Sequence, residues 1–525
     1  MLTPVPPSLT RRQDLLGLLD PQTVYDMAIV GGGATGLGLA LDAASRGYSV
    51  VLVESDDFAK GTSSRSTKLV HGGVRYLAQG NIALVREALH ERSNLLRNAP
   101  HIAQPLPFVM PTYSWWDKFF YGAGLKMYDA LAGKAGLGKT AFLSSDETLH
   151  CLPTVQPSGL HGGVKYWDGQ FNDSKLALAL VRSAALQGAL LLNYVRASSL
   201  RYAAGKVCGI RCTDALTDQV MDIQARCVVN ATGVWVDSLR EQDGTVEAMV
   251  APSQGVHIVV DKKFFPGKAA LMVPKTADGR VLFAVPWLGK VILGTTDTPR
   301  HDLAREPLAF EEEIDFILSE SARYLRLAPT RADVKSIWVG LRPLVKPPKE
   351  EGDNTKALSR EHTVLVSASG LVTVTGGKWT TYRAMAQDVM DKCLESHLIE
   401  PKGASVTEHL TLVGAEATDA APVSIGEPEG LHSYGSEQAW VEALPGHDHW
   451  LCDGLSEAMV RFAARYEYAV RVEDVLARRS RLLFLDAQLA AHLAPQVGEI
   501  LFSETGLEPD VDGFVRLARQ YTLQA

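Results

Sequence analysis

The stretch YDMAIVGGGATGLGLALDAASRGYSVVLVESDDFAKGTSSRSTKLVHGGVRYL, residues 25–77, decides the fold of this chain. Its apolar run 27–30 predicts a buried strand, which passes through the glycine turn 31–36 into a helix of small residues. A second apolar run, 50–53, ends on the acid Glu54. This order of strand, glycine turn, helix and acid-ended strand predicts a β-α-β unit that binds a dinucleotide.

Each polar or glycine position of this unit has a physical reason. Gly31 permits the tight turn, Gly33 lets the backbone approach a pyrophosphate, and Gly36 lets the helix pack close to the strand. The first amides of the helix, near Thr35, point at the anion. Glu54 comes where an acid can hold a ribose hydroxyl. The alternative, a glycine turn in a β-α-β unit that binds no nucleotide, leaves the acid unexplained.

Composition bounds the class of protein. A length of 525 residues predicts two or three domains, and 46% hydrophobic with 21% charged residues is typical of a soluble globular protein. The net charge of −8 and the pI near 6.0 argue against nucleic acid as a partner. Six cysteines without CxxC pairing favour a reducing compartment and give no sign of a metal site.

The sequence contains no clear targeting or membrane-spanning signal. Residues 1–24 form an N-terminal extension that lacks the order of charge and apolar residues found in a secretory signal. No run of about eighteen apolar residues occurs, so no helix is expected to span a bilayer. We therefore expect a cytoplasmic protein, one that can still lie on a membrane surface.

Aromatic and basic residues are mixed in the stretch 113–139. Trp115, Trp116, Phe119 and Phe120 lie there among several lysines. Such a mixture is found in elements that lie in a membrane interface. A helical hairpin packed on the body of the protein, with its lysines in water, is the alternative interpretation.

A second strand that ends in small residues is predicted at 225–233. Its last residues, Ala231, Thr232 and Gly233, let the backbone return close to a bound nucleotide. Near the other end of the chain, residues 456–504 predict helices. Their arginines Arg478, Arg479 and Arg481 suggest a solvated or internally paired face rather than an anion site.

Seven segments now carry a family resemblance: VGGGATGLG, TSSRSTKLVHGGVRYL, VNATGVWVD, QGVHIVV, ILGTTDT, VGLRPL and TGGKWTTYR, in this order. Together they resemble the FAD-dependent sn-glycerol-3-phosphate dehydrogenases of aerobic respiration. The resemblance runs from about Tyr25 to Glu395, and YEYAVRVEDVLARRSRLLFLDA is similar to the helical C-terminal domain of that family.

The resemblance implies an α/β fold in which a Rossmann-like FAD-binding domain is interleaved with a β-rich substrate domain and followed by a C-terminal α-helical domain. We expect residues 25–400 to hold the first two, with FAD-binding segments at about 25–100, 195–250 and 340–400. The substrate domain would take about 101–194 and 251–339. Residues 401–525 would form the linker and the helical domain.

The resemblance also implies the reaction and its partners. FAD would oxidise glycerol 3-phosphate to dihydroxyacetone phosphate by accepting a hydride from C2, and the electrons would pass to a membrane quinone. The protein would associate peripherally with the inner face of the cell membrane. A homodimer is left open.

The chemistry requires cations for a phosphate and a base for the C2 hydroxyl. The motifs place Arg75 and Arg342 as substrate anchors, with Tyr76 and Lys378 beside them, and Arg342 also as a stabiliser of the developing alkoxide. His257 is the candidate base because the pKa of histidine lies near working pH. In an apolar strand, a histidine is more often an ordinary core residue.

The expected cofactor residues come from four segments of the motifs: Gly31, Gly33, Thr35, Gly36 and Glu54; Thr62, Ser63, Ser64, Lys68, His71 and Gly72; Ala231, Thr232 and Gly233; and Gly376, Gly377, Lys378 and Thr380. His71 is a weaker candidate base. Asp297 is expected to cap a turn. Gln254 stands where some family members have lysine, which removes a positive charge near the expected phosphate site.

Three rival functions remain open. An oxidase on the same scaffold would pass electrons to oxygen and release hydrogen peroxide, although the inserted segment expected of such oxidases is not seen. A flavin oxidoreductase for another 2-hydroxy or 2-amino acid is also compatible, since arginines suit a carboxylate as well as a phosphate. A sensor or scaffold with a structural flavin would need no phosphate anchors.

Overall fold

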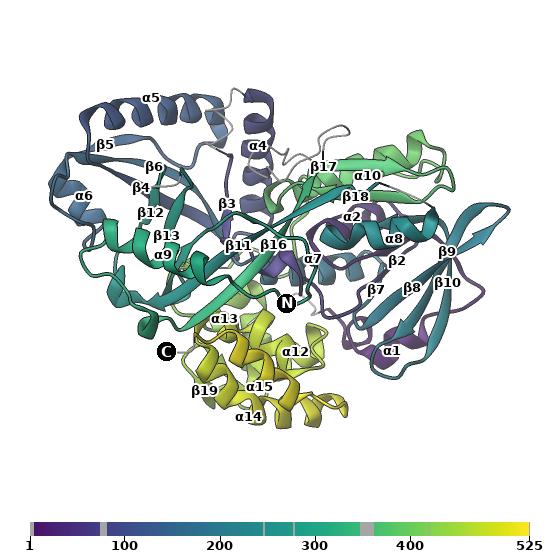
Figure 1. The fold of residues 1–525 in the computed structure, drawn as a ribbon. Helices are drawn as coiled ribbons and strands as arrows, with labels where there is room; N and C mark the ends of the chain where they lie inside the picture. Colours follow the sequence, from purple (N-terminus) through teal and green to yellow (C-terminus); the bar gives the residue numbers. More distant parts are fainter. Residues whose placement is uncertain are drawn as a thin grey trace.

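A computed structural model describes residues 5–73, 81–244, 247–276, 279–346, 362–418 and 421–523. Within them the chain forms two large mixed sheets and a C-terminal helical domain below them (Figure 1). One sheet carries the glycine turn, and the other is built from the segments expected to bind substrate. This agrees with the predicted α/β architecture.

The nucleotide sheet is centred on the strand predicted at 27–30. Its parallel strands are, in spatial order, β18 (Val372–Gly376), β10 (Val220–Asn230), β1 (Val24–Val30), β2 (Val50–Val53) and β7 (Leu190–Leu192). Antiparallel strands extend it: β17 (His362–Val366), β8 (Val195–Ala203) and β9 (Lys206–Asp214). The apolar runs of β1 and β2 are fully buried because helices cover the parallel strands.

Three helices pack together beside this sheet: α2 (Ala34–Ser45), α7 (Asp173–Leu186) and α10 (Tyr382–Glu395). Two more lie near its edges: α1 (Arg12–Gly17) and α8 (Val236–Asp243). The small residues of α2 permit close packing. A Cβ on Gly38 would lie 2.8 Å from the Tyr382 ring of α10. The helix predicted after the glycine turn is therefore confirmed, and its glycines have a packing role.

The second sheet runs in the order β15 (Thr298–Pro299), β11 (Val250–Asp261), β14 (Lys290–Gly294), β13 (Leu282–Trp287), β12 (Ala270–Val273), β4 (Ala103–Thr112), β6 (Gly162–Phe171) and β3 (Leu69–Val70). Off this path, β16 (Ser336–Val345) pairs with β11, and β5 (Ala141–Leu143) pairs with β6. Helices α4 (Ile82–Asn98), α5 (Trp115–Ala132), α6 (Ser145–Cys151) and α9 (Glu311–Tyr324) pack around it.

Two segments belong to a different sheet than the sequence suggests. Residues 173–194 were expected in the substrate domain, yet α7 packs on α2, and β7 pairs with β2 of the nucleotide sheet. Residues 340–345 were expected in the FAD-binding domain, yet they continue β16 along β11 of the second sheet. The chain therefore enters the nucleotide sheet earlier than expected in the first place, after β6 ends at Phe171, and later than expected in the second, after β16 ends at Val345.

The C-terminal domain holds the helices predicted for 456–504 and one more. They are α12 (Glu457–Tyr466), the π-helical turn η10 (Asp474–Arg479), α13 (Leu482–Leu485), α14 (Ala487–Thr505) and α15 (Val511–Gln520). The arginines at 478, 479 and 481, at the end of η10 and just after it, are buried and paired. This agrees with one of the two predicted alternatives, an internally paired face. Arg478 and Arg479 both bond to Asp57, and Arg481 donates to the Ser64 carbonyl at 2.6 Å.

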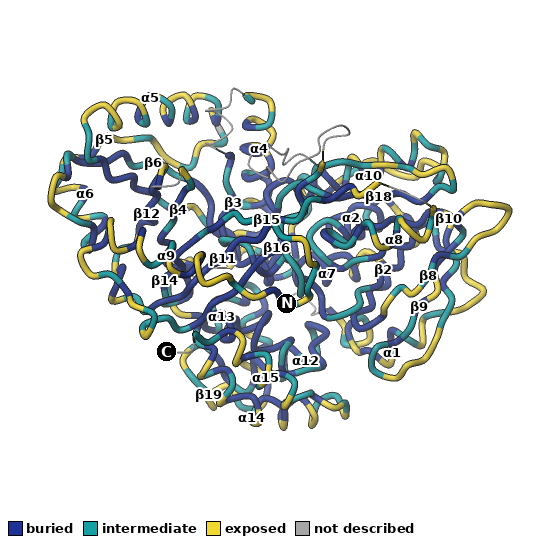
Figure 2. The backbone as a smooth tube through the Cα atoms, viewed as in Figure 1, coloured by how far each residue is buried: buried dark blue, intermediate teal, exposed yellow. Residues whose placement is uncertain are grey.

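The aromatic stretch forms one long helix, α5, rather than the hairpin considered from the sequence. Figure 1 shows α5 at the rim of the molecule, and Figure 2 colours much of it as exposed. Trp116 and Phe120 are 84% and 74% exposed. Within the described ranges, none of the helices is long and apolar enough to cross a membrane.

Candidate functional site

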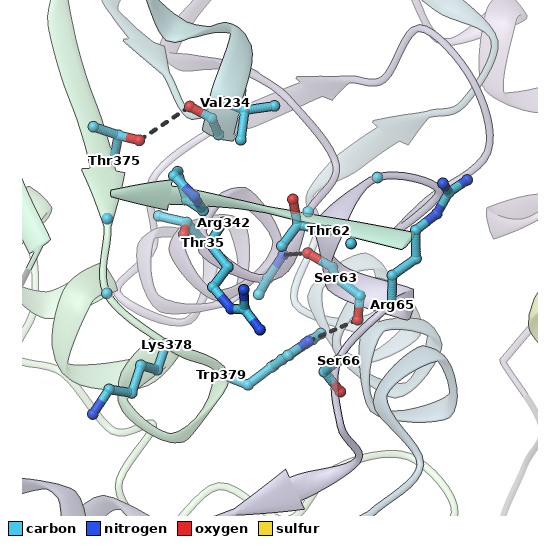
Figure 3. Close-up of a pocket in the computed structure, with 18 of the residues that line it drawn as sticks. Thr35, Thr62, Ser63, Arg65, Ser66, Val234, Arg342, Thr375, Lys378 and Trp379 are labelled. Carbon is cyan, nitrogen blue, oxygen red and sulfur yellow. Dashed lines mark hydrogen bonds between the residues drawn. The ribbon is translucent and has the colours of Figure 1, made fainter. Parts of the chain in front are cut away.

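A cavity of about 840 Å³ lies where the two sheets meet. This volume is near the upper end of the roughly 300–1,000 Å³ typical of small-molecule sites. One wall comes from the nucleotide sheet and the loops after its strands, and the other comes from the second sheet. We call them the nucleotide wall and the sheet wall. Figure 3 shows residues of both around the same space.

The nucleotide wall is built on glycines that bring backbone close to backbone. Gly31 has a φ of +113°, and a Cβ there would lie 2.5 Å from the Ala231 carbonyl oxygen. A Cβ on Gly36 would lie 1.9 Å from the Gly31 carbonyl oxygen. The turn and the end of β10 therefore meet only because these positions have no side chain. The positive φ of Gly31 agrees with the tight turn predicted there, whereas its contact with the end of β10 was not predicted.

Glu54 and Ser63 hold the glycine turn from the side. The Glu54 carboxylate accepts hydrogen bonds from the Gly32 amide at 2.7 Å and the Asp56 amide at 3.0 Å. Burial, together with the charge of Asp56, raises the pKa of Glu54. Ser63 Oγ accepts from the Ala34 amide at 2.9 Å, at the start of α2. Both side chains line the cavity, so the turn and the cavity floor form one hydrogen-bonded unit.

Hydrogen bonds also tie the loop after β2 to distant parts of the chain. Thr62 Oγ1 donates to the Leu341 carbonyl at 2.6 Å. Trp379 Nε1 donates to the Ser63 carbonyl at 2.7 Å (Figure 3). On the facing side, Thr375 Oγ1 donates to the Gly233 carbonyl at 3.0 Å. The loop is thus fixed between β16 and the segment after β18.

Arg342 is the arginine of the sheet wall. It lies on β16, and its Nη2 donates to Thr295 Oγ1 at 3.1 Å and to the Thr296 carbonyl at 3.0 Å. Its Nη1 lies 3.4 Å from Asp297 Oδ1. A Cβ on Gly255 would lie 2.2 Å from Nη2, so the guanidinium occupies space that only a glycine leaves. The side chain remains 23% exposed and lines the cavity, where it can meet an anion.

His257 lines the same cavity from β11. Its Nε2 and Thr67 Oγ1 are 2.9 Å apart, and its ring stacks on Trp338 with centroids 5.2 Å apart. Its Nδ1 is buried and has no hydrogen-bond partner among the residues that the structure describes. Burial, then the charges of Lys68 and Arg342, hold the pKa of His257 well below its usual range. The ring is therefore neutral near pH 7, the state in which an imidazole can accept a proton.

Lys68 is placed differently from the prediction, which had it contact the cofactor. Its side chain is buried and does not line the cavity, and its Nζ pairs with Asp173 at 2.6 Å and donates to the Ser64 carbonyl at 2.8 Å. Burial lowers the pKa of Lys68 to about 7, against the opposing charge of Asp173. Lys68 therefore acts on the cavity through its charge, which lowers the pKa of His257.

The comparisons with known proteins agree with this geometry. A family model described as FAD dependent oxidoreductase matches residues 26–383, and one described as the C-terminal domain of alpha-glycerophosphate oxidase matches residues 405–511. The mitochondrial glycerol-3-phosphate dehydrogenase of Homo sapiens is 41% identical, over 95% of this chain and 72% of that protein. The mitochondrial enzyme of Arabidopsis thaliana is 40% identical, over 95% of this chain and 86% of that protein.

The chain belongs to the family of FAD-dependent glycerol-3-phosphate dehydrogenases. Among solved structures, the glycerol-3-phosphate dehydrogenase of Bacillus halodurans complexed with FAD is 29% identical, with a TM-score of 0.78 over 98% of this chain and 99% of that one. The L-alpha-glycerophosphate oxidase of Mycoplasma pneumoniae, at 16% identity and a TM-score of 0.56, shares the fold.

The residues present fit the FAD that this family uses. The cavity lies against the glycine turn, where Gly31 and Gly33 line it without side chains, and it extends to Arg342. Glu54, Thr35 and Ser63 line the part near the turn and would hold the nucleotide end. When bound, FAD supplies the two-electron acceptor of the dehydrogenase reaction. The described residues contain no cluster of acidic, histidine or cysteine side chains that could hold a metal.

Most of the predicted site residues of this dehydrogenase come together. The cavity is lined by Gly31, Gly33, Thr35, Glu54, Thr62, Ser63, His71, Ala231, Thr232, Gly233, His257, Arg342, Gly376, Gly377, Lys378 and Thr380. Gly36, Ser64, Lys68 and Gly72 lie behind its surface and support it. In Figure 3 the Lys378 side chain points away from the Arg342 guanidinium. Arg75 and Tyr76 lie outside the described residues.

Two residues near Arg342 differ from their sequence interpretation. Asp297, expected only to cap a turn, lines the cavity, pairs with Arg342 and accepts from Ser253 Oγ. Gln254, expected near the phosphate site, is fully buried and bonds to Glu313 and Arg300 instead. Residue 254 therefore belongs to the support of the sheet wall. Thr67, the hydrogen-bond partner of His257, was missed because its motif gave no sign of the distant histidine.

Proposed function

We propose that this protein oxidises sn-glycerol 3-phosphate at C2 to dihydroxyacetone phosphate, with FAD as the hydride acceptor and a membrane quinone as the final electron acceptor. The observation that carries the proposal is that Arg342 and a neutral His257 line the same cavity as the glycine turn. The relatives of known name are glycerol-3-phosphate dehydrogenases, which supports the substrate.

Arg342 binds the negative charge in this proposal. Guanidinium groups suit phosphate and also stabilise an oxygen on which negative charge develops. Thr295, Thr296 and Asp297 occupy the inner edge of the guanidinium, so its direction is set before a substrate arrives. Arg75 and Tyr76, which carry the same motif assignment, remain proposed partners for the phosphate.

His257 takes the proton from the C2 hydroxyl. Its ring is neutral and held by stacking on Trp338, so it can accept a proton without first losing one. Thr67 Oγ1, at 2.9 Å from Nε2, both orients the ring and lies on the cavity lining. The hydroxyl proton moves to His257 as the hydride leaves C2, which balances the oxidation.

The test uses the purified protein with its bound flavin. Under anaerobic conditions, glycerol 3-phosphate should bleach the visible flavin absorbance without added NAD. A quinone analogue should then restore it faster than air does, with little hydrogen peroxide. Rapid recovery in air with stoichiometric peroxide would instead identify an oxidase. Bleaching by 2-hydroxy or 2-amino acids, and not by glycerol 3-phosphate, would overturn the substrate, and an absence of bleaching by any of them would favour a structural flavin.

Peripheral contact with a membrane is proposed through α5. Trp115, Trp116, Phe119 and Phe120 are each more than half exposed on one helix, and Lys126 and Lys139 are exposed nearby. Apolar side chains beside cations suit the surface of an anionic bilayer. We expect the double variant Trp116→Ser, Phe120→Ser to lose co-sedimentation with vesicles that contain phosphatidylglycerol. The control is Phe502→Ser, since Phe502 is 56% exposed on the distant helix α14. Equal losses in the two variants would refute the assignment.

A further inference from the structure

Glu313 is a buried carboxylate that takes no part in the chemistry proposed above. It lies in the first turn of α9, is 4% exposed and does not line the cavity. Its Oε1 accepts from Thr296 Oγ1 at 2.8 Å and Thr298 Oγ1 at 2.6 Å, while its Oε2 accepts from the Phe310 amide at 3.1 Å and from Gln254 Nε2. Four donors thus surround one buried anion.

Three of these donors come from the segments that hold Arg342. Thr296 and Thr298 flank Asp297, and the segment 295–298 supplies three acceptors to the Arg342 guanidinium: Thr295 Oγ1, the Thr296 carbonyl and Asp297 Oδ1. Gln254 precedes Gly255, the position whose missing side chain makes room for that guanidinium. Glu313 therefore binds both sides of the space that Arg342 fills.

The same network reaches the strand of His257. Thr296 Oγ1 accepts a hydrogen bond from the Val256 amide at 3.0 Å while it donates to Glu313. This leaves the hydroxyl with one defined orientation, because its proton must point at the carboxylate. The segment 295–298 is thus fixed to the strand residue directly before His257 as well as to α9.

An ionised carboxylate suits this position for a reason of hydrogen-bond chemistry. A carboxylate offers acceptors on both oxygens, whereas the amide of glutamine would turn an NH₂ group toward two hydroxyls, or toward a backbone amide and another amide. In the first orientation the two hydroxyls can accept from the NH₂ group but lose the acceptor for their own protons, and in the second the NH₂ group faces two N–H donors. Either orientation leaves buried donors without acceptors, which the segment can relieve by moving.

We propose that Glu313 is a positioning residue, which fixes segment 295–298 so that the Arg342 guanidinium is aimed into the cavity. This inference rests on the proposed role of Arg342 as the anion anchor. It assigns to α9, outside the cavity, control over the affinity and rate of the proposed reaction.

The first experiment compares Glu313→Gln with Glu312→Gln in the full-length, FAD-loaded protein. Glu312 is the exposed neighbour on the same turn of α9. A misplacement of about 1 Å at a reacting group can reduce the rate about 10²-fold. We expect kcat/KM for glycerol 3-phosphate to fall by about that factor in Glu313→Gln and by less than twofold in Glu312→Gln. Flavin content should be equal in the two variants, and an unchanged kcat/KM in Glu313→Gln would overturn the proposal.

A double-mutant cycle with Arg342→Lys separates positioning from a general loss of structure. If Glu313 acts through Arg342, Glu313→Gln should cost little in the Arg342→Lys background, since coupled residues are not additive. The full 10²-fold loss in both backgrounds would overturn the proposal. Should Glu313→Gln fail to fold with flavin, Thr298→Val removes one donor to Glu313, and the same coupling should appear at a smaller scale.

A binding measurement distinguishes failure of this inference from failure of the proposed function. Inorganic phosphate is titrated into the wild type and variants, and its Kd is read from the flavin absorbance. We expect a weaker Kd in Arg342→Lys and Glu313→Gln alike. Phosphate binding that depends on both residues, in a protein that does not oxidise glycerol 3-phosphate, would overturn the function and keep the inference. If phosphate binding is lost in Arg342→Lys and unchanged in Glu313→Gln, the positioning role of Glu313 would be overturned and the proposed role of Arg342 would be kept.

Discussion

The two walls of the cavity reach rigidity by different means. In the nucleotide wall, glycines at 31 and 36 bring main chain against main chain, both within the turn and against the end of β10. In the sheet wall, charged and polar side chains are held in place by other side chains from four segments. Close contact between backbones leaves no room for an added side chain. A network of side-chain hydrogen bonds loses its geometry when one donor or acceptor is replaced.

The largest effect is expected from removal of the anion anchor. Arg342→Ala should reduce kcat/KM for glycerol 3-phosphate about 10³-fold, because a charged donor to the substrate is lost from a partly buried site. Anaerobic stopped-flow reduction of the flavin measures this directly. The matched control is Arg331→Ala, which removes an arginine that forms surface pairs with Glu311 and Asp315. A loss below about threefold in Arg342→Ala would mean that the anion is bound elsewhere.

Loss of the base should have the next largest effect. We expect His257→Asn to slow flavin reduction about 10²-fold, the lower end for general base catalysis, while the flavin stays bound. The wild-type rate should be flat from about pH 8 to 6.5, because the pKa of His257 is held well below 6.5. The rate should then fall as protons occupy the ring at lower pH. A wild-type limb centred above pH 6.5 would contradict a neutral, buried base.

A change in the nucleotide wall should act on stability and cofactor retention rather than on the chemical step. Gly36→Ala places a methyl group against the Gly31 carbonyl, and overpacking of this kind costs about 1–3 kcal/mol. The melting temperature and the bound flavin per chain should both decrease. In Gly17→Ala nothing lies within 4 Å of the new Cβ, so both should stay unchanged. Normal flavin retention in Gly36→Ala would show that the turn can shift to accommodate the added methyl group.

The smallest effect is expected from loss of the hydrogen bond between Thr67 and His257. Thr67→Val keeps the shape of the side chain and removes the partner of His257 Nε2, which is worth up to about 1.5 kcal/mol or tenfold in rate. Thr67→Ser should keep most of the wild-type rate because it retains the hydroxyl. If serine slowed flavin reduction more than valine did, the methyl group and not the hydroxyl would be the part that matters.

Sequence and structure agree best where the contacts are local in the chain. The turn 31–36 and the position of Glu54 were predictable because the spacing of the glycines and of the acid along the chain is typical of a β-α-β unit that binds a dinucleotide. His257 and Arg342 were found only through the family resemblance, since a histidine in an apolar strand gives no local signal. The partners Thr67 and Glu313 depend on how β11 lies against β14, β15 and β16, which no spacing in the sequence encodes. Lys68 was misplaced because its buried partner, Asp173, is distant in the sequence and gives no local signal.

The pairing of η10 with the loop after β2 has a consequence for the order in which the protein is made. Asp57 and the Ser64 carbonyl, in the first eighth of the chain, receive their hydrogen bonds from Arg478, Arg479 and Arg481. A ribosome that has not yet passed codon 481 holds a chain in which Lys68 can donate to the Ser64 carbonyl but the three arginine donors are not all present. The glycine turn can form early in synthesis, but the loop beside it reaches its final bonds only when translation is nearly complete.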